Sequence, residues 1–159
     1  MVIFDFSKDS ILDWTVVDDS VMGGRSSGHL DISESGLAVF HGEVSLENNG
    51  GFTSTRYRFQ EKNVSDYQKI CIRIKGDGKT YKFRIKEQLN HRYSFVYIFT
   101  TSGQWESIEI PFKNLMPWYR GTKLDAPEFP GKRLSEVAFL IANKQAENFK
   151  LEIDKIVLE

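Results

Sequence analysis

Apolar and polar residues alternate along most of this chain, and no segment repeats its apolar residues at the spacing of a helix. In residues 70–75 isoleucine occupies every second position, and in residues 81–86 tyrosine, phenylalanine and isoleucine do the same. A period of two places the apolar residues on one face of a β-strand. About ten such segments at short spacing predict an all-β fold, and we expect a β-sandwich of the jelly-roll type.

The same alternation predicts where the strands lie. The expected strands are residues 3–6, 14–17, 28–33, 37–43, 52–59, 70–75, 81–86, 93–99, 105–112, 137–142 and 149–158. Residues 93–99 are apolar or aromatic on both faces, which indicates a central strand covered on both sides. Pro111 has no N–H to donate, so it marks a strand end or a sheet edge. The apolar positions shift by one residue near Asp154 and Lys155, which predicts a β-bulge.

Two connections stand out between these strands. The turn Gly76-Asp77-Gly78 is expected to join residues 70–75 and 81–86 into a hairpin with one apolar and one basic face. Residues 113–132 contain three prolines and lose the alternation, which predicts a long irregular segment of functional or Ω-loop type. Residues 64–67 and 115–119 are the segments expected to hold a single helical turn.

Composition fits one domain over residues 1–159, since a chain of this length with 40% hydrophobic residues buries roughly 70% of its unfolded surface. A net charge of −1 gives no overall field for nucleic acid, so we expect no nucleic-acid partner. No apolar run approaches the ~20 residues that span a bilayer, so we expect no integral membrane segment. Residues 1–9 lack a signal or transit pattern, and the one cysteine, Cys71, lies in a strand. We therefore expect a soluble, cytoplasmic protein with an unreactive thiol.

Two glycine pairs, Gly23-Gly24 and Gly50-Gly51, are set among Asp, Asn and Ser and lead into strands. Glycine tolerates positive φ and lets another group come close, so the pairs indicate loops whose backbone shape is dictated. The first loop lacks the Gly-Lys-Ser/Thr ending and the following helix of a phosphate loop. A structural role is therefore favoured over ligand contact.

The segments that carry these glycines point to a family. Trp14 with residues 19–26, 40–44 and 49–56 resembles the complex I intermediate-associated protein 30 family. Later segments extend the resemblance over nearly the whole chain: residues 76–78 with Tyr81, Trp105 ahead of residues 110–112, Arg120-Gly121, and residues 149–156.

The resemblance implies a galactose-binding-domain-like β-sandwich, related in architecture to carbohydrate-binding modules. It also implies a non-catalytic role, since the mitochondrial members are assembly factors of respiratory complex I. The motif positions in the two loops are Asp19, Met22, Gly23, Gly24, Arg25, Ser26, Asn49, Gly50, Gly51 and Arg56. We expect the two loops to meet in space, with Arg56 reaching an acid such as Asp19.

No nucleophile, base and orienting group can be named, so we expect no enzyme and no cofactor. His29, His41 and His91 are not at metal-ligand spacing, so no zinc site is predicted. A structural calcium ion held by Asp5 or Asp154 is an open alternative to the prediction of no metal.

The basic residues of the expected hairpin have two interpretations. Arg73, Lys75, Lys82, Arg84 and Lys86 either form a solvated outer face opposite Glu43, Glu106 and Glu109 or line a binding groove. The candidate ligand face comprises Arg73, Arg84, Tyr97, Trp118 and Tyr119, with the loop pair Trp118-Tyr119 as the exposed aromatic element. We predict a non-enzymatic binding module that takes a protein partner as an assembly or chaperone-like factor. The alternative is a carbohydrate-binding module.

Overall fold

The computed structural model describes all 159 residues and consists of thirteen β-strands, linked by turns and four short 3₁₀ segments. The strands are β1 (Val2–Asp5), β2 (Trp14–Asp18), β3 (Ser27–Ile32), β4 (Ala38–Val44), β5 (Thr53–Asn63), β6 (Lys69–Lys75), β7 (Thr80–Lys86), β8 (Ser94–Thr100), β9 (Trp105–Pro111), β10 (Met116–Tyr119), β11 (Thr122–Lys123), β12 (Arg133–Ile141) and β13 (Glu147–Leu158). The all-β prediction is confirmed. None of the helical segments has the length and apolar character to cross a membrane.

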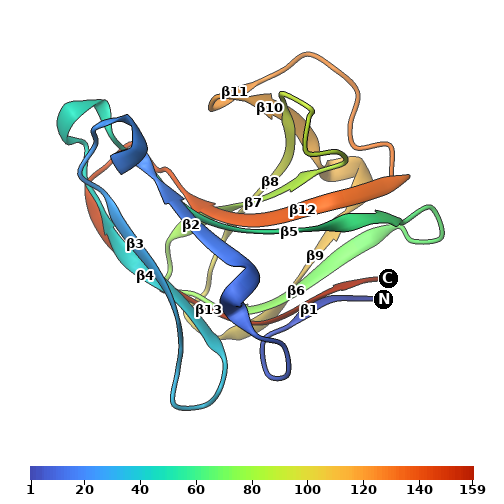
Figure 1. Ribbon diagram of the computed structural model, residues 1–159, viewed down its shortest axis with the longest axis horizontal. Helices are drawn as coiled ribbons and strands as arrows, with labels where there is room; N and C mark the ends of the chain where they lie inside the picture. The colour runs from blue at the N-terminus through green and yellow to red at the C-terminus, as the bar shows by residue number, and fades with distance from the viewer.

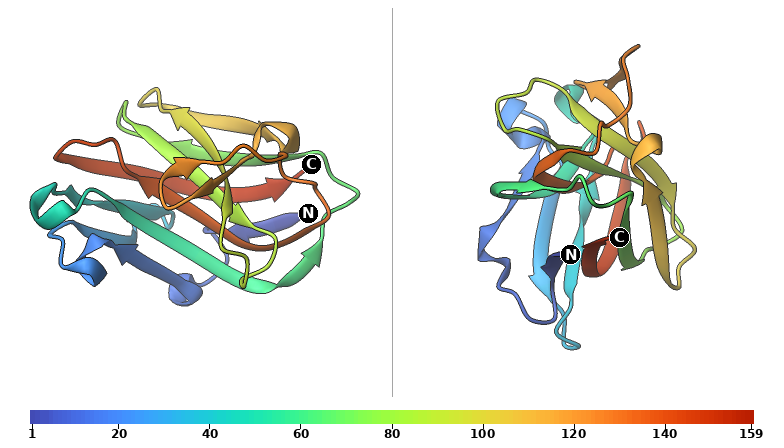
Figure 2. Two further views of the ribbon diagram at one scale, coloured as in Figure 1. Left: turned by 90° about the horizontal axis from the view of Figure 1, so that it is seen from above. Right: turned by 90° about the vertical axis from the view of Figure 1, so that its right-hand side faces the viewer.

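The strands form two antiparallel sheets packed face to face, as expected for a jelly-roll sandwich (Figure 1). The six-stranded sheet has the order β3-β4-β13-β6-β9, and β1 also pairs with β13. The seven-stranded sheet has the order β11-β10-β8-β7-β12-β5-β2. The two chain ends lie side by side, and the Met1 amino group donates to the carbonyl of Leu158 at 3.1 Å (Figure 2).

Strand β13 organises the six-stranded sheet. One edge of β13 pairs with β4 up to Ile153 and then with β1, beginning at Lys155. The ladder with β6 on its other edge shifts register between Ile153 and Lys155. The β-bulge predicted from the phase change is therefore confirmed, and it lies where β13 changes partners.

The apolar side chains of the alternating strands fill the space between the sheets. Ile70, Ile72 and Ile74 of β6 and Phe83 of β7 are fully buried in a core cluster of 29 residues. Tyr81 is also buried there, and its hydroxyl donates to Asp77 at 2.9 Å. The inward faces read from the sequence are correct.

The expected hairpin of residues 70–86 is wrong. Strand β6 pairs with β13 and β9, whereas β7 pairs with β8 and β12, so the chain crosses from one sheet to the other at residues 76–79. The crossing sets the apolar faces of the two strands against each other across the core. As a result, Arg73 and Lys75 lie in the opposite sheet from Lys82, Arg84 and Lys86.

Residues 113–132 are more ordered than predicted. They include β10 and β11, so the segment 115–119 is extended rather than helical. Residues 64–67 form the expected single turn, in which the N–H of Tyr67 donates to the carbonyl of Val64 at 3.1 Å. Pro111 ends β9, an edge strand, as predicted. Strand β8 lies between β7 and β10 as an interior strand, but Ile98 is 49% exposed, so β8 is not covered on both sides along its whole length.

Candidate functional site

The two glycine loops meet at the side chain of Asp19, which is 1% exposed. From its own loop, Asp19 accepts hydrogen bonds from the N–H (2.9 Å) and the hydroxyl (2.5 Å) of Ser26. From the second loop it accepts from the N–H groups of Gly51 (2.6 Å) and Phe52 (3.2 Å). A Cβ on Gly50 would approach Asp19 Oδ2 to 2.5 Å, so glycine is what allows the second loop to come this close.

The pKa of Asp19 reflects two opposing effects. Burial raises it, but the hydrogen bonds from Ser26, Gly51 and Phe52 favour the ionised form and outweigh burial, so the pKa lies below the usual value of 3.8. The expectation that the loops meet agrees with this geometry. The expected Arg56 partner does not, because backbone N–H groups and one hydroxyl already satisfy the carboxylate.

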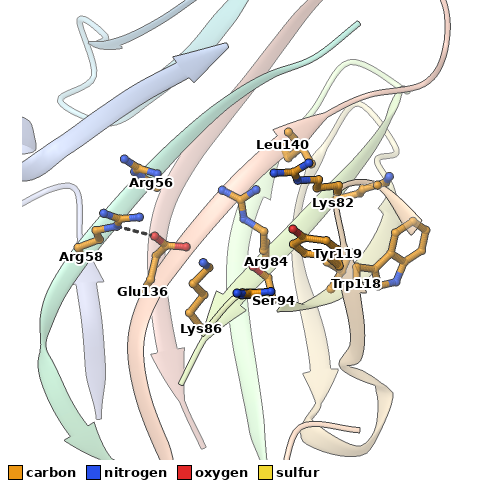
Figure 3. Close-up of a pocket in the computed structure, with 14 residues that line it drawn as sticks. Arg56, Arg58, Lys82, Arg84, Lys86, Ser94, Trp118, Tyr119, Glu136 and Leu140 are labelled. Carbon is orange, nitrogen blue, oxygen red and sulfur yellow. Dashed lines mark hydrogen bonds and ion pairs between the residues drawn. The ribbon is translucent and has the colours of Figure 1, made fainter. Parts of the chain in front are cut away.

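Arg56 lies instead on the outer face of the seven-stranded sheet, where a hollow of about 680 Å³ opens to solvent. We call this hollow the basic pocket. Its lining residues are Arg56, Arg58, Lys82, Arg84, Lys86, Arg92, Ser94, Val96, Trp118, Tyr119, Arg120, Gly121, Glu136 and Leu140. Seven of these are cationic and one, Glu136, is acidic (Figure 3).

Strand register explains the gathering of cations. Glu136 on β12 is opposite Arg58 of β5 on one side and Lys86 of β7 on the other. Two residues further along β12, Ala138 is opposite Arg56 and Arg84. We call Arg58, Glu136 and Lys86 the first row, and Arg56, Ala138 and Arg84 the second row. Because alternate residues share a face, the side chains of both rows point out of the sandwich into the basic pocket.

Glu136 anchors the first row. Its side chain is 1% exposed, and its Oε1 accepts from Arg58 Nε at 2.7 Å (Figure 3). The ladder between β12 and β5 shifts register between Leu134 and Glu136. Such irregularities often re-aim side chains near sites.

The second row has no acid of its own. Ala138 separates Arg56 from Arg84, and Arg84 Nε is buried without a hydrogen-bond partner. Burial lowers the pKa of Arg84; Glu136 opposes this effect, and Arg56 and Arg58 add to it. The pKa of Lys86 is lowered first by burial as well, with a further decrease from neighbouring arginines. The pocket therefore concentrates positive charge at buried positions, where solvation by water stabilises the charge less.

Aromatic residues form one wall of the pocket. Trp118 on β10 lies under the ammonium group of Lys82, which is 4.5 Å from the ring centroid. Tyr119 is 37% exposed and has the guanidinium of Arg120 at 5.3 Å. Burial lowers the pKa of Lys82, and so does the nearby Lys144.

The predicted ligand face is only partly assembled. Arg84, Trp118 and Tyr119 line the basic pocket, although the two aromatic residues belong to a strand rather than a loop. Arg73 lies in the other sheet, 3.4 Å from Asp154. Tyr97 packs against the core. Neither belongs to the pocket.

Four charged pocket residues were missed by sequence reasoning: Arg58, Arg92, Arg120 and Glu136. The alternation in residues 55–59 already places Arg56 and Arg58 on one face. Nothing local indicates that Glu136 lies between them and Lys86.

Except for His91, whose buried Nδ1 has no hydrogen-bond partner, the histidines and carboxylates weighed as metal ligands have protein partners. His41 Nε2 lies 2.7 Å from Asp31, and His29 is its neighbour across β3 and β4. Asp5 accepts from the Ser7 hydroxyl at 2.6 Å, and Asp154 lies beside Arg73.

Cys71 has a carboxylate neighbour that was not anticipated. Burial, followed by a hydrogen bond to Glu159, raises the pKa of the thiol to about 11. A thiol with this pKa is almost entirely protonated at neutral pH, in line with the expected low reactivity.

Comparison with known proteins adds a family and a fold. The model of the family described as "Complex I intermediate-associated protein 30 (CIA30)" matches residues 4–153. Curated relatives include the mitochondrial complex I intermediate-associated protein 30 of Drosophila melanogaster, 28% identical over 99% of this chain, and that of Mus musculus, 27% identical over 98%. The chain spans only 62% and 55% of the lengths of these relatives.

A solved structure confirms the architecture. The family 11 carbohydrate-binding module of a cellulosomal cellulase of Clostridium thermocellum superposes with a TM-score of 0.72, covering 99% of this chain and 92% of the module. At 21% sequence identity this likeness shows the fold.

Proposed function

The chain belongs to the complex I intermediate-associated protein 30 family, and from this premise we propose that it is a non-enzymatic binding module that holds a protein partner in its basic pocket. Its role would be that of an assembly or chaperone-like factor. Because the two curated relatives are named as mitochondrial, the cytoplasmic location expected from the sequence stays a prediction.

One observation carries the proposed site. Seven cations surround one acid in a hollow with an aromatic wall, on the sheet face that does not contribute to the core. Such a concentration of arginine and aromatic side chains is typical of protein-binding hot spots.

A carbohydrate is the second candidate ligand. The observation that favours it is Trp118, a half-exposed aromatic residue beside a hollowed sheet face, in a fold shared with carbohydrate-binding modules. Fold likeness is only an associational argument for function.

A pull-down from native lysate tests the proposal. The tagged chain is compared with Arg84→Gln, which changes the pocket, and with the matched control Arg73→Gln, which removes the same charge from the opposite sheet. We expect defined proteins to be retained by the parent chain and by Arg73→Gln and lost from Arg84→Gln. Recovery of background proteins only, or equal retention by both variants, would contradict the proposal. Titration with a glycan panel, with Trp118→Ala as the negative control, tests the carbohydrate alternative.

A further inference from the structure

We infer that the basic pocket recognises an acidic peptide segment, one of whose carboxylates binds between Arg56 and Arg84 above Ala138. The inference rests on the proposed function, because it identifies the chemistry of the partner that the pocket would hold.

The charges of the pocket favour an anionic partner. Elsewhere on the molecule, some cations pair with nearby acids: Arg25 with Glu47, Lys69 with Glu109, and Lys79 with Asp77. Among the seven pocket cations, Arg58 alone forms an ion pair with an acidic side chain. Like charges gathered in a partly desolvated hollow repel one another, so an anion supplied by a ligand relieves an existing cost.

Glu136 shows how a carboxylate fits this surface. In its row it lies between Arg58 and Lys86; its Oε1 accepts from Arg58 Nε, and its Oε2 is buried without a hydrogen-bond partner. In the next row, one repeat of about 6.8 Å along the strands, Arg56 and Arg84 flank Ala138 in the same way. Their backbones are two strand spacings apart, about 9.6 Å, so both long side chains can reach one carboxylate above the small alanine.

Arg84 supplies a second reason to place the anion there. Its Nε is buried and has no hydrogen-bond acceptor in the protein. A buried donor without an acceptor is destabilising, and a carboxylate above Ala138 would accept from it. A guanidinium also offers the paired donors that match a carboxylate.

The remaining cations suit a second carboxylate of the same segment. Lys82, Arg92 and Arg120 lie towards the aromatic wall of the pocket, on the side away from Arg56. In an extended peptide, alternate side chains lie on one face about 6.8 Å apart. Acidic residues at alternate positions would therefore reach both groups of cations.

Other polyanions fit less well. The whole chain has a net charge of −1, and the positive charge of the basic pocket lies within a hollow of about 680 Å³ rather than along an extended track for nucleic acid. A flat membrane surface does not reach the floor of a hollow where Glu136 is buried. A sugar ring would compete with the Lys82 ammonium for one face of Trp118.

Isothermal titration with synthetic peptides tests the inference. The probe is a blocked peptide of alternating glutamate and glycine, and its control has glutamine in place of glutamate. We expect binding of the glutamate peptide at low salt, no measurable binding of the glutamine peptide, and at least a tenfold weakening when salt is raised, because the contact is between charges.

Variants locate the contact. Arg84→Gln and Arg56→Gln should each weaken binding of the glutamate peptide about tenfold or more, whereas Arg73→Gln leaves it unchanged. Both pocket variants should keep or raise the melting temperature, because each removes a cation from a repulsive cluster. If either arginine had a structural role instead, its variant should lower the melting temperature. Peptide affinity and melting temperature together therefore separate an effect on binding from an effect on folding.

Several outcomes would overturn the inference. These are equal binding of the two peptides, no binding at low salt, affinity unaffected by both pocket variants, or tighter binding of a uronic-acid oligosaccharide or an oligonucleotide of equal charge. If the pull-down retains defined proteins through Arg84 but the glutamate peptide fails, the proposed function stands and the acidic segment is refuted.

Discussion

Asp19→Asn is the sharpest test of how the two glycine loops are held. The substitution preserves shape and removes the charge from a side chain that is 1% exposed and accepts four hydrogen bonds. If the amide oxygen takes the position of Oδ2, it still faces Ser26 Oγ, Gly51 N and Phe52 N. The amide nitrogen then takes the position of Oδ1 and faces the N–H of Ser26, so that two donors oppose each other.

The magnitude follows from these contacts. Losing the charge from three retained hydrogen bonds costs about 1 kcal/mol each, and the opposed donor at Ser26 adds about 1–3 kcal/mol. Relief from burying an ionised group offsets part of this loss. We therefore expect the free energy of unfolding to fall by about 3 kcal/mol, a large fraction of the roughly 5–15 kcal/mol of a typical domain.

Urea unfolding of the parent chain and the variant measures the difference. The matched control is Asp18→Asn at the neighbouring position, where the partly exposed carboxylate accepts from the N–H of Ser20 at 3.0 Å, from the Ser20 hydroxyl, and from the N–H of Gly28 at 3.3 Å. Asparagine also serves at such capping positions, so the control should lose less than about 1 kcal/mol. Equal losses in the two variants, or a loss at Asp19 below about 1 kcal/mol, would refute the assignment of Asp19 as the link between the loops.

The same prediction has a pH signature. The folded-state pKa of Asp19 is lowered from 3.8, so its ionised form contributes stability that is fully present above pH 3.8. This contribution is lost as the pH falls through the folded-state pKa. The difference in stability between the parent chain and Asp19→Asn should therefore be constant near neutral pH and shrink in the acid range below 3.8.

Three further predictions address other parts of the structure. Gly24→Ala should lower the free energy of unfolding in urea by about 1–3 kcal/mol, because the added Cβ would overlap the Asp19 carboxylate. The control Gly23→Ala has open space around its Cβ and should lose only about 1 kcal/mol, because its φ is +86°. Glu136→Gln should lower the free energy of unfolding by about 3 kcal/mol, because it removes the only acid among the pocket cations; calorimetry showing no change would contradict this. The rate at which Cys71 reacts with a disulfide reagent should rise about tenfold per pH unit up to about pH 11; a plateau near pH 8 would contradict the raised pKa.

The strands were predictable because alternation is a local property. Residues 70–75 and 81–86 each show which face is apolar, and the structure buries those faces. Alternation does not show which sheet a strand joins, and a Gly-Asp-Gly turn suits a hairpin and a crossover equally. This ambiguity is why Arg73 was grouped with Arg84, although the two residues lie in different sheets.

The partner of Asp19 was not predictable for a different reason. Arginine is the obvious partner for a motif carboxylate, but here most of the donors are backbone N–H groups, which every residue except proline carries. The basic pocket was also not predictable from the sequence. Its central rows combine β5, β12 and β7, which are far apart in the sequence and adjacent only through the strand order.

The hydrogen bonds of Asp19 fix the register of strand β5, and this register determines the face on which the pocket residue Arg56 lies. The Asp19 N–H donates to the carbonyl of Phe52, and the Asp19 carboxylate holds Gly51 and Phe52 immediately before β5 begins at Thr53. A slip of one residue in this register would turn Arg56 and the following outward residues of β5 into the core, because side chains alternate between the two faces. Arg56 therefore depends on Asp19 without touching it, and a variant that loosens the loops should weaken anion binding even at temperatures where the sandwich stays folded.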